Sequence, residues 1–214
     1  MSVVTDMVRH KLTPSSLPKW KQVLALARHK GILRPRDLDE LGIAREYLNK
    51  LHQEGFFERV GRGLYRLTDG EIGRFAQIAE IAKRVPKGVI CLISALDFHE
   101  LTTQIPHQIW LAIPPKDRAP RIPYPPLRII RLAERPLHFG VETHTIDGVD
   151  VKVFSAAKTV ADCFKFRNQV GLDVALEALR DCYRQKKATM DQLWKAAEVC
   201  RMTNVMRPYL ESLT

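Results

Sequence analysis

An arginine and an asparagine four residues apart are the first side chains in this sequence whose types suggest a chemistry. Arg45 and Asn49 lie in the segment AREYLNKLHQEG (44–55), where Leu48 and Leu51 mark the buried side of a helix. The spacing places both polar residues on one exposed side. Arginine reads guanine and asparagine reads adenine through paired hydrogen bonds, so the pattern favours base contacts in a DNA groove. A solvated helix face would carry the same two residues, and that alternative stays open.

A glycine-rich stretch next to this helix favours contact with phosphate. In VGRGLYRL (60–67), Arg62 stands between two glycines, which let the backbone approach another molecule closely. Basic residues around both segments suit phosphate, which positions a protein on DNA without reading its sequence. The predicted phosphate contacts are Arg34, Arg36, Lys50, Arg59, Arg62 and Arg66.

Three helical segments and a hairpin would position these side chains. Apolar residues at helical spacing predict a helix that ends near Gly31, and Pro35 and Gly42 bracket a second, short one. The third helix is the segment 44–55, ended by Gly55, and the alternation of FFERVGRGLYRLT predicts two strands with a tight turn. This order is typical of a winged helix-turn-helix, although such modules also bind proteins.

The charge distribution supports a polyanionic partner. The chain has 214 residues and a formal net charge of +10. Residues 1–75 carry 14 basic and 9 acidic side chains, and residues 115–140 carry 6 and 2. Such blocks attract nucleic acid and also anionic membranes, so charge alone does not select the partner.

The second basic block coincides with a proline-rich segment. IPPKDRAPRIPYPPLR (113–128) holds six prolines in sixteen residues, which predicts an extended loop. A proline-rich ligand for a partner domain is one interpretation. We favour a second contact with nucleic acid or an acidic protein surface, through Lys116, Arg118, Arg121 and Arg128.

The rest of the chain predicts a mixed domain, which makes the fold class α+β. A linking helix is expected over residues 71–88, followed by strands in 89–154 with a hairpin turn at Asp147–Gly148. Ser155 is a candidate N-cap for a C-terminal group of helices. The expected domains are a winged helix-turn-helix (1–70), the linking helix (71–88) and a mixed α/β domain (89–214).

Cofactors, metals and a membrane location are not expected. The four cysteines form no C-x-x-C pair and read as reduced, apolar side chains. The longest apolar run, Val89 to Leu96, is far shorter than the ~20 residues that a membrane span needs. The segment MSVVTDMVRHK lacks the features of a secretory signal, which predicts a cytoplasmic protein.

One constellation raises the alternative of an enzyme. Glu142 with Asp150 and Lys152 resembles the acid-x-Lys signature of metal-dependent nucleases, in which carboxylates hold Mg²⁺ and a lysine assists the attacking water. A hairpin with alternating polar residues produces the same letters, because residues two apart on a strand share a face. We therefore expect no catalytic residues and no enzymatic activity.

Beyond these patterns, the sequence resembles the AbiEi-type antitoxins of bacterial type IV toxin–antitoxin systems. The resemblance rests on LRPRDL, Gly42–Ile43, Leu48 with Leu51, and VGRGLY, and it continues through SALDFHELT and IDGVDVKVFSAAKTVADCF to cover residues 15 to 214. It implies a winged helix that represses its own operon at operator repeats, and a C-terminal domain with antitoxic activity. It also implies a nucleotidyltransferase-like toxin, whose direct contact with the antitoxin stays open because type IV antitoxins generally act without a stable complex.

The sequence is also compatible with two other functions. One is a stand-alone transcriptional regulator whose C-terminal domain binds a ligand or a partner, and the other is the nuclease. Operator repeats usually require two protein copies, and the sequence is compatible with a dimer or with monomers that bind cooperatively.

Overall fold

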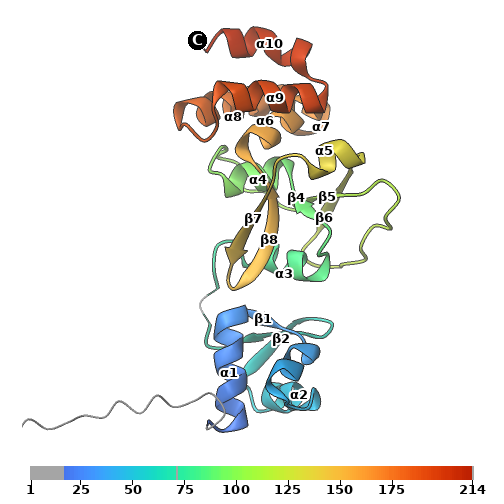
Figure 1. Cartoon of the computed structure of the whole chain (residues 1–214), viewed down its shortest axis with the longest axis vertical. Helices are drawn as coiled ribbons and strands as arrows, with labels where there is room; N and C mark the ends of the chain where they lie inside the picture. The colour runs from blue at the N-terminus through green and yellow to red at the C-terminus, as the bar shows by residue number, and fades with distance from the viewer. Residues whose placement is uncertain (1–16, 71, 214) are drawn as a thin grey trace, which may run out of the picture. The chain divides into compact units, whose positions relative to one another are not determined.

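The computed structural model describes residues 17–70 and 72–213, which divide into two compact units between Ile72 and Gly73 (Figure 1). We call them the N-terminal unit and the C-terminal unit. Helices and strands occur in both, so the predicted α+β class is confirmed. The predicted first domain also includes residues 1–16, and these lie outside the described residues together with Glu71 and Thr214.

The N-terminal unit consists of three helical segments and a small antiparallel sheet. Its strand order is β1-β3-β2, so β3 lies in the centre. The elements are α1 (Lys19–Lys30), β1 (Ile32–Leu33), the 3-10 helix η2 (Pro35–Leu41), α2 (Glu46–Gln53), β2 (Phe57–Gly61) and β3 (Leu64–Leu67).

Local sequence explains where these helices begin and end. The second segment is a 3-10 helix, which starts at Pro35 and ends at Gly42 in the left-handed conformation. The Asp37 carboxylate accepts a hydrogen bond of 2.7 Å from the backbone N–H of Arg34 and so caps its start. Leu48 and Leu51 of α2 are buried, as their spacing predicts, and they pack in one core with residues of α1, η2 and the sheet.

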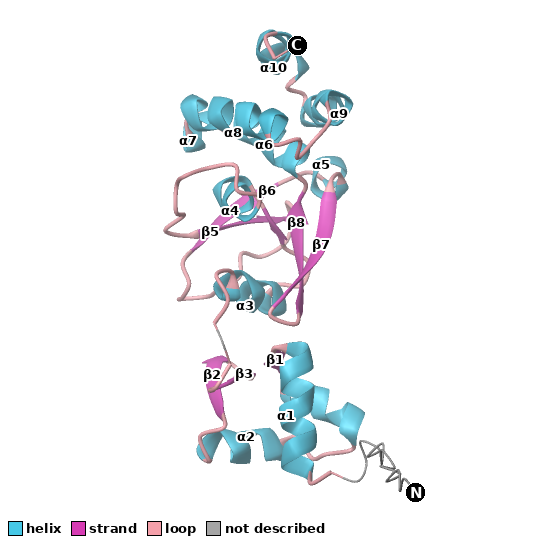
Figure 2. Cartoon of the chain, turned by 90° about the vertical axis from the view of Figure 1, so that its left-hand side faces the viewer, coloured by secondary structure: helices cyan, strands magenta, loops and turns pink. Residues whose placement is uncertain are grey.

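The C-terminal unit contains one five-stranded sheet and eight helices within the described residues. In both views the helices α6, α8, α9 and α10 lie together at one end of this unit (Figures 1 and 2). The elements are α3 (Ala76–Arg84), β4 (Val89–Ile90), α4 (Leu92–Phe98), β5 (Ile109–Ile113), β6 (Leu127–Arg131), α5 (Glu134–His138), β7 (Val141–Ile146), β8 (Val149–Phe154), α6 (Ala156–Lys165), α7 (Arg167–Val170), α8 (Leu172–Arg184), α9 (Met190–Cys200) and α10 (Thr203–Glu211).

The sheet of this unit is mixed, with strand order β6-β5-β4-β8-β7. Strands β7 and β8 form the expected hairpin, and Asp147 and Gly148 both have positive φ at its turn. Ser155 caps α6, because its hydroxyl accepts a hydrogen bond from the backbone N–H of Lys158. The helix expected between the domains is shorter than predicted, Ala76–Arg84, and it packs against β8.

A fully buried ion pair joins two turns of α6. Lys158 Nζ contacts the Asp162 carboxylate and lies 4.2 Å from the centroid of the Phe154 ring. The Cys200 thiol donates to Asp162 Oδ1 at 3.3 Å, so the carboxylate has partners on two helices. Such a pair is costly to desolvate and strongly destabilising to break on one side only.

The four cysteines are buried and free, as predicted. Burial raises the pKa of the Cys182 thiol to about 11 and that of Cys200 to about 12. Both thiols therefore stay protonated and unreactive near neutral pH. Within residues 17–70 and 72–213, no helix combines the length and the hydropathy that crossing a lipid bilayer requires.

Candidate nucleic-acid interface

Arg45 stands at the start of α2 and is held there by a carboxylate from η2. It is the N-cap residue, and its side chain is exposed. Asp39 Oδ1 accepts a hydrogen bond of 3.0 Å from Arg45 Nε, and Asp39 Oδ2 accepts one of 2.6 Å from Arg45 Nη2. This two-point contact across the Gly42 turn fixes the plane of the guanidinium.

The same contact shifts the pKa of both groups. The hydrogen bond from Arg45 lowers the pKa of the Asp39 carboxyl, and the bond to Asp39 raises the pKa of Arg45. A guanidinium has five N–H donors, so the edge that carries Nη1 still has donors for another acceptor. Arg45 is thus oriented by Asp39 without being fully occupied by it.

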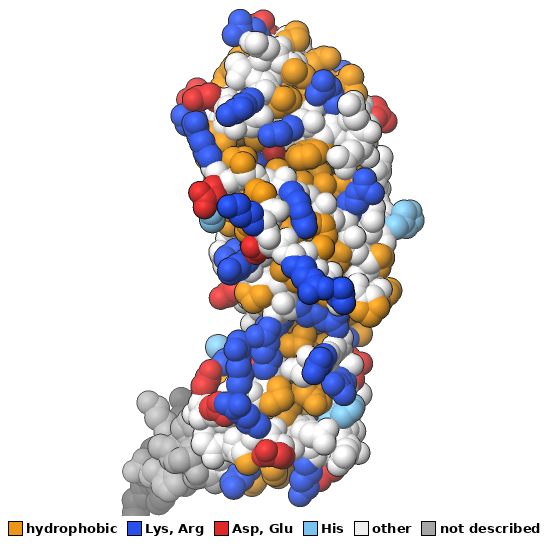
Figure 3. Space-filling model, turned by 90° about the vertical axis from the view of Figure 1, so that its right-hand side faces the viewer, with side chains coloured by type: hydrophobic (Ala, Val, Ile, Leu, Met, Phe, Trp, Pro, Cys, Tyr) orange, Lys and Arg blue, Asp and Glu red, His pale blue; other side chains and the backbone are white. Residues whose placement is uncertain are grey.

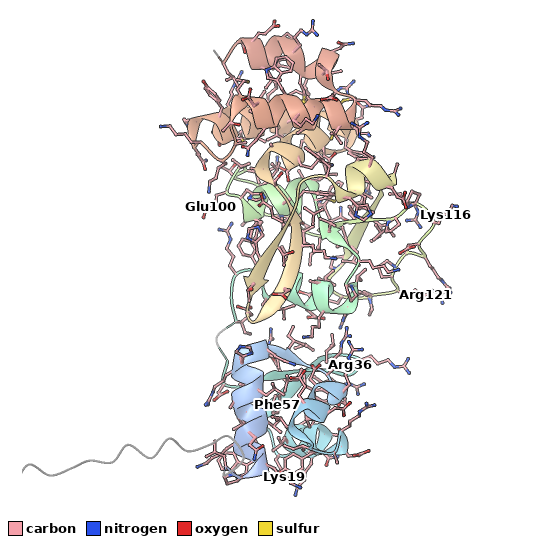
Figure 4. All side chains as sticks on the ribbon, in the orientation of Figure 1. Lys19, Arg36, Phe57, Glu100, Lys116 and Arg121 are labelled. Atoms are coloured by element: carbon pink, nitrogen blue, oxygen red, sulfur yellow. The ribbon has the colours of Figure 1, made fainter. Side chains whose placement is uncertain are left out.

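Three predicted contacts are exposed and have no polar partner among the described residues. Asn49 lies on the outward face of α2, one turn beyond Arg45. Arg36 lies on η2 (labelled in Figure 4), and Arg62 lies in the turn between β2 and β3. These side chains can contact another molecule without first breaking an interaction within the protein.

The hairpin turn brings Arg62 to its tip. Strands β2 and β3 pair from Phe57 with Leu67 to Gly61 with Leu64, so Arg62 and Gly63 form the turn itself. Gly63 has φ of +67°, which a side chain would strain. Nothing in the structure lies within 4 Å of the position that a Cβ at Gly63 would take, so the turn is open to an approaching molecule.

Other predicted phosphate contacts already have partners within the protein. Arg66 is only partly exposed, and its Nη2 lies 2.5 Å from Glu58 Oε1 across the two strands. Lys50 pairs with Glu54 one turn along α2 at 3.9 Å. Arg59 Nε donates to the backbone oxygen of Gly61 at 3.3 Å, and Arg34 also has a polar interaction. Among the described residues, three of the eight predicted DNA contacts therefore have no polar partner, and the other five interact within the protein.

The second basic patch lies in the C-terminal unit, on the loop between β5 and β6. Lys116, Arg118 and Arg121 are exposed there, and Figure 4 shows Lys116 and Arg121 pointing outward from the loop. Figure 3 views the side of this unit that carries the loop and shows more basic than acidic side chains. Arg128 differs, because its guanidinium lies 5.4 Å from the Trp110 ring centroid and donates to Gln169.

Contacts that the sequence does not reveal hold this loop at both ends. Arg131 Nη2 donates to the backbone oxygen of Asp117 at 3.1 Å. Near the other end, Arg84 Nη1 donates to the backbone oxygen of Tyr124 at 3.1 Å, and Gln77 of the same helix donates to the Tyr124 hydroxyl at 3.0 Å. The loop is irregular, as its prolines predict, yet fixed in place by the helix α3 and the strand β6.

The nuclease-like residues are not brought together. In the β7–β8 register, Asp150 is paired with Thr145 and Lys152 with Thr143, which puts these residues on one face of the hairpin. Glu142 is paired with Val153 and so lies on the opposite face. Among the residues that the structure describes, no group of three or more His, Cys, Asp or Glu side chains could hold a metal ion.

Sequence reasoning missed two acidic residues that act on the predicted contacts. Asp39 precedes Arg45 by six residues, and Glu58 precedes Arg66 by eight, so neither spacing is a helical or strand repeat. Only the Gly42 turn brings the first pair together, and only the β2–β3 register brings the second. The pairing of Glu58 with Arg66 is the one that a hairpin prediction could have identified, because it follows from the position of the turn.

Comparison with known proteins adds a family for the N-terminal unit. Residues 21–68 match the sequence profile of a family described as "Transcriptional regulator, AbiEi antitoxin". No curated protein matches the chain. The RV2827C protein from Mycobacterium tuberculosis has a similar crystal structure, with a TM-score of 0.58 and 11% identity over 91% of this chain and 78% of that one, and this likeness concerns the fold alone. The predicted resemblance is thus confirmed over residues 21–68, which match the AbiEi antitoxin family of transcriptional regulators.

Proposed function

We propose that this chain is a sequence-specific DNA-binding repressor of its own operon and the antitoxin of a type IV toxin–antitoxin pair. The observation that carries the proposal is the exposure of Asn49 on α2 and of Arg62 at the hairpin tip, neither of which has a polar partner among the described residues. Both lie in the segment that matches the AbiEi antitoxin transcriptional regulators. A chain with this function would be cytoplasmic.

In this mechanism the N-terminal unit is a winged helix-turn-helix. The α2 helix enters the major groove, with Arg45 and Asn49 at base edges, and the hairpin rests on the sugar–phosphate backbone. Asp39 holds the Arg45 guanidinium in one plane before DNA arrives, which lowers the entropy that base reading costs. Phosphate contacts come first from Arg36 and Arg62, because neither has to leave a polar partner within residues 17–70 and 72–213.

The C-terminal unit carries the antitoxic activity in this proposal. It counteracts a nucleotidyltransferase-like toxin, with or without a stable complex. Operator repeats are filled by two copies of the chain, as a dimer or as monomers that bind cooperatively. The basic loop with Lys116, Arg118 and Arg121 supplies a second contact for nucleic acid or for an acidic protein surface. No enzymatic step is assigned to either unit.

The second candidate is a stand-alone regulator whose C-terminal unit binds a small ligand. A pocket in that unit, between α5 and the sheet, favours this alternative. The two functions share the DNA-binding step and differ in whether a toxin is neutralised.

Two readouts on the full chain separate these functions. The first is binding to the DNA upstream of its own gene, against a scrambled duplex of equal length. The second is growth of cells that express the toxin encoded beside it. Asn49→Ala with Arg62→Gln should abolish specific binding and leave neutralisation intact, while Lys195→Gln, a matched change on α9, should alter neither. No preference for the upstream DNA would refute the repressor, and no rescue of growth would refute the antitoxin.

A further inference from the structure

The C-terminal unit contains a pocket of about 410 Å³ that none of the proposed DNA contacts lines. Its apolar part comes from Val89 at the start of β4, Pro114 just after β5, Leu137 of α5 and Val141 at the start of β7. Val89 and Leu137 belong to the buried core of the unit, and Val141 packs against that core. The pocket therefore has an apolar floor continuous with the core, and its volume lies at the lower end of the range for small-molecule sites.

Its polar lining is basic. Lys87, Lys152 and His138 line the pocket, and all three side chains belong to exposed residues. Lys152 Nζ donates a hydrogen bond to the backbone oxygen of Pro86 at 3.3 Å. Within the part of the chain that the structure describes, neither lysine forms an ion pair with a carboxylate, and no acidic residue lines the pocket. Two ammonium groups beside apolar surface thus lack a counter-charge, which a bound anion would supply.

These three side chains come from separate elements that are held in place. Lys152 lies within β8, which is paired with β7 on one side and β4 on the other. Lys87 lies in the turn that leads into β4, and His138 ends α5. The backbone positions that carry these side chains are thus set by strand pairing and by the end of α5, so the three polar groups start from fixed points when a ligand binds.

We propose that this pocket binds a small organic carboxylate. The hydrocarbon part lies on Val89, Leu137 and Val141, and the carboxylate lies between the ammonium groups of Lys87 and Lys152, with the His138 ring as a further donor. The apolar floor argues for this class over inorganic phosphate, which would leave that surface in contact with water. The pocket shares no residue with the proposed DNA contacts. A negative result for carboxylate binding can therefore be told apart from a negative result for DNA binding.

The test is an NMR titration of the full chain with three probes. They are 3-phenylpropionate, its neutral analogue 3-phenylpropionamide, and inorganic phosphate. We expect 3-phenylpropionate to bind with a Kd on the order of 1 mM, as a fragment of this size should. Chemical shift changes should centre on Lys87, Val89, Leu137, Val141 and Lys152. The amide and phosphate should each bind at least about tenfold more weakly.

Variants then assign the charge contacts. Lys87→Gln and Lys152→Gln should each raise the Kd for 3-phenylpropionate by about tenfold, because each removes a charge-assisted hydrogen bond. Both residues are exposed, so thermal melting should stay close to wild type, and Lys195→Gln on α9 should leave the Kd unchanged. The proposal is overturned if the amide or phosphate binds as tightly as the carboxylate, if the shifts lie elsewhere, or if Lys152→Gln binds like wild type.

Discussion

Arg62 offers the sharpest test of the DNA-binding mechanism, because it lies at the hairpin tip and has no polar partner in the described part of the chain. The substitution Arg62→Gln removes its charge and keeps a polar, although shorter, side chain. Gly63 and the β2–β3 pairing are untouched, so the hairpin should keep its shape. Any effect on DNA binding can then be assigned to the lost charge.

The expected magnitude follows from counterion release. Each phosphate contact contributes about −0.9 to the slope of log K against log salt concentration. Arg62→Gln should therefore make the slope shallower by about 0.9. Between about 50 and about 200 mM salt, the affinity ratio of wild type to variant should shrink by roughly 3.5-fold.

A double variant of the neighbouring ion pair provides the matched control. Arg66 is held by Glu58, so changing both to glutamine removes one charge of each sign and leaves the net charge unchanged. The slope of Glu58→Gln/Arg66→Gln should equal that of wild type. Fluorescence anisotropy with the upstream duplex and with a scrambled duplex, over the same salt series, measures all three proteins.

Two results would refute this reasoning. If Arg62→Gln lowers affinity equally at every salt concentration, Arg62 makes no phosphate contact and acts on the fold or on a base. If the double variant changes the slope by about 0.9, Arg66 leaves Glu58 to bind phosphate, and the ion pairs seen in the free protein do not predict the contacts in the complex.

Three further predictions concern charged or titratable groups. Asp39→Asn should reduce the preference for the upstream duplex by about fivefold, because Arg45 loses its fixed orientation, and should slightly tighten binding to scrambled DNA, as anisotropy would show. Asp162→Ala should lower the free energy of unfolding by ~3–5 kcal/mol in urea, because it leaves the Lys158 ammonium buried and unpaired, while Asp162→Leu with Lys158→Met should recover most of that loss. Lowering the pH from 7 to 5 should destabilise the wild type more than His99→Gln in thermal melts.

The sign of the His99 effect follows from its surroundings. Burial has the largest effect on the pKa of His99, and it lowers this pKa. The Phe154 carbonyl and Glu142 raise the pKa, whereas His144 and Lys187 lower it. The net pKa lies below the ordinary value of 6.5, so the unfolded chain binds the proton first. The stability that depends on neutral His99 is fully present above about pH 6.5 and is lost as the pH falls toward the folded-state pKa. An equal acid sensitivity of His99→Gln would contradict it.

Controls for the other two predictions use the same partners. Arg45→Gln should lose base discrimination with or without Asp39→Asn, so the two changes should not add. If Asp39→Asn keeps full discrimination, Asp39 has no positioning role. If the apolar double variant at Lys158 and Asp162 is as unstable as the single one, the cost comes from lost packing of α6 and not from an unpaired charge.

The sequence predicted most of the helix ends, turns and caps, because the residues that set them act only on near neighbours in the chain. Gly42 and Gly55 end helices, Asp147–Gly148 closes a hairpin, and Ser155 caps α6, and each depends only on a few neighbouring residues. The buried Leu48 followed from helical spacing in the same way. These are properties of the backbone that distant parts of the chain do not override.

The contacts that the sequence could not predict join side chains that only the folded chain brings together. The contact of Asp39 with Arg45 depends on the Gly42 turn. Lys87 and Lys152 line one pocket only because β4 and β8 are neighbours, and the hydrogen bond from Lys152 to the backbone of Pro86 joins residues 66 positions apart. The spacing of Glu142, Asp150 and Lys152 does not show which face of the hairpin each residue takes, because that depends on the strand register.

The ion pairs of the N-terminal unit also limit how much its net charge can contribute to DNA binding. If all six predicted phosphate contacts formed, the salt slope would be about −5.4. If Lys50 and Arg66 stay with Glu54 and Glu58 while the other four arginines, including the engaged Arg34 and Arg59, turn to phosphate, the slope falls to about −3.6. Over a fourfold rise in salt the first value means roughly an 1,800-fold loss of affinity and the second roughly 150-fold. A wild-type slope near −3.6 therefore indicates that the pairs persist in the complex, and one near −5.4 indicates that both acids release their partners to phosphate.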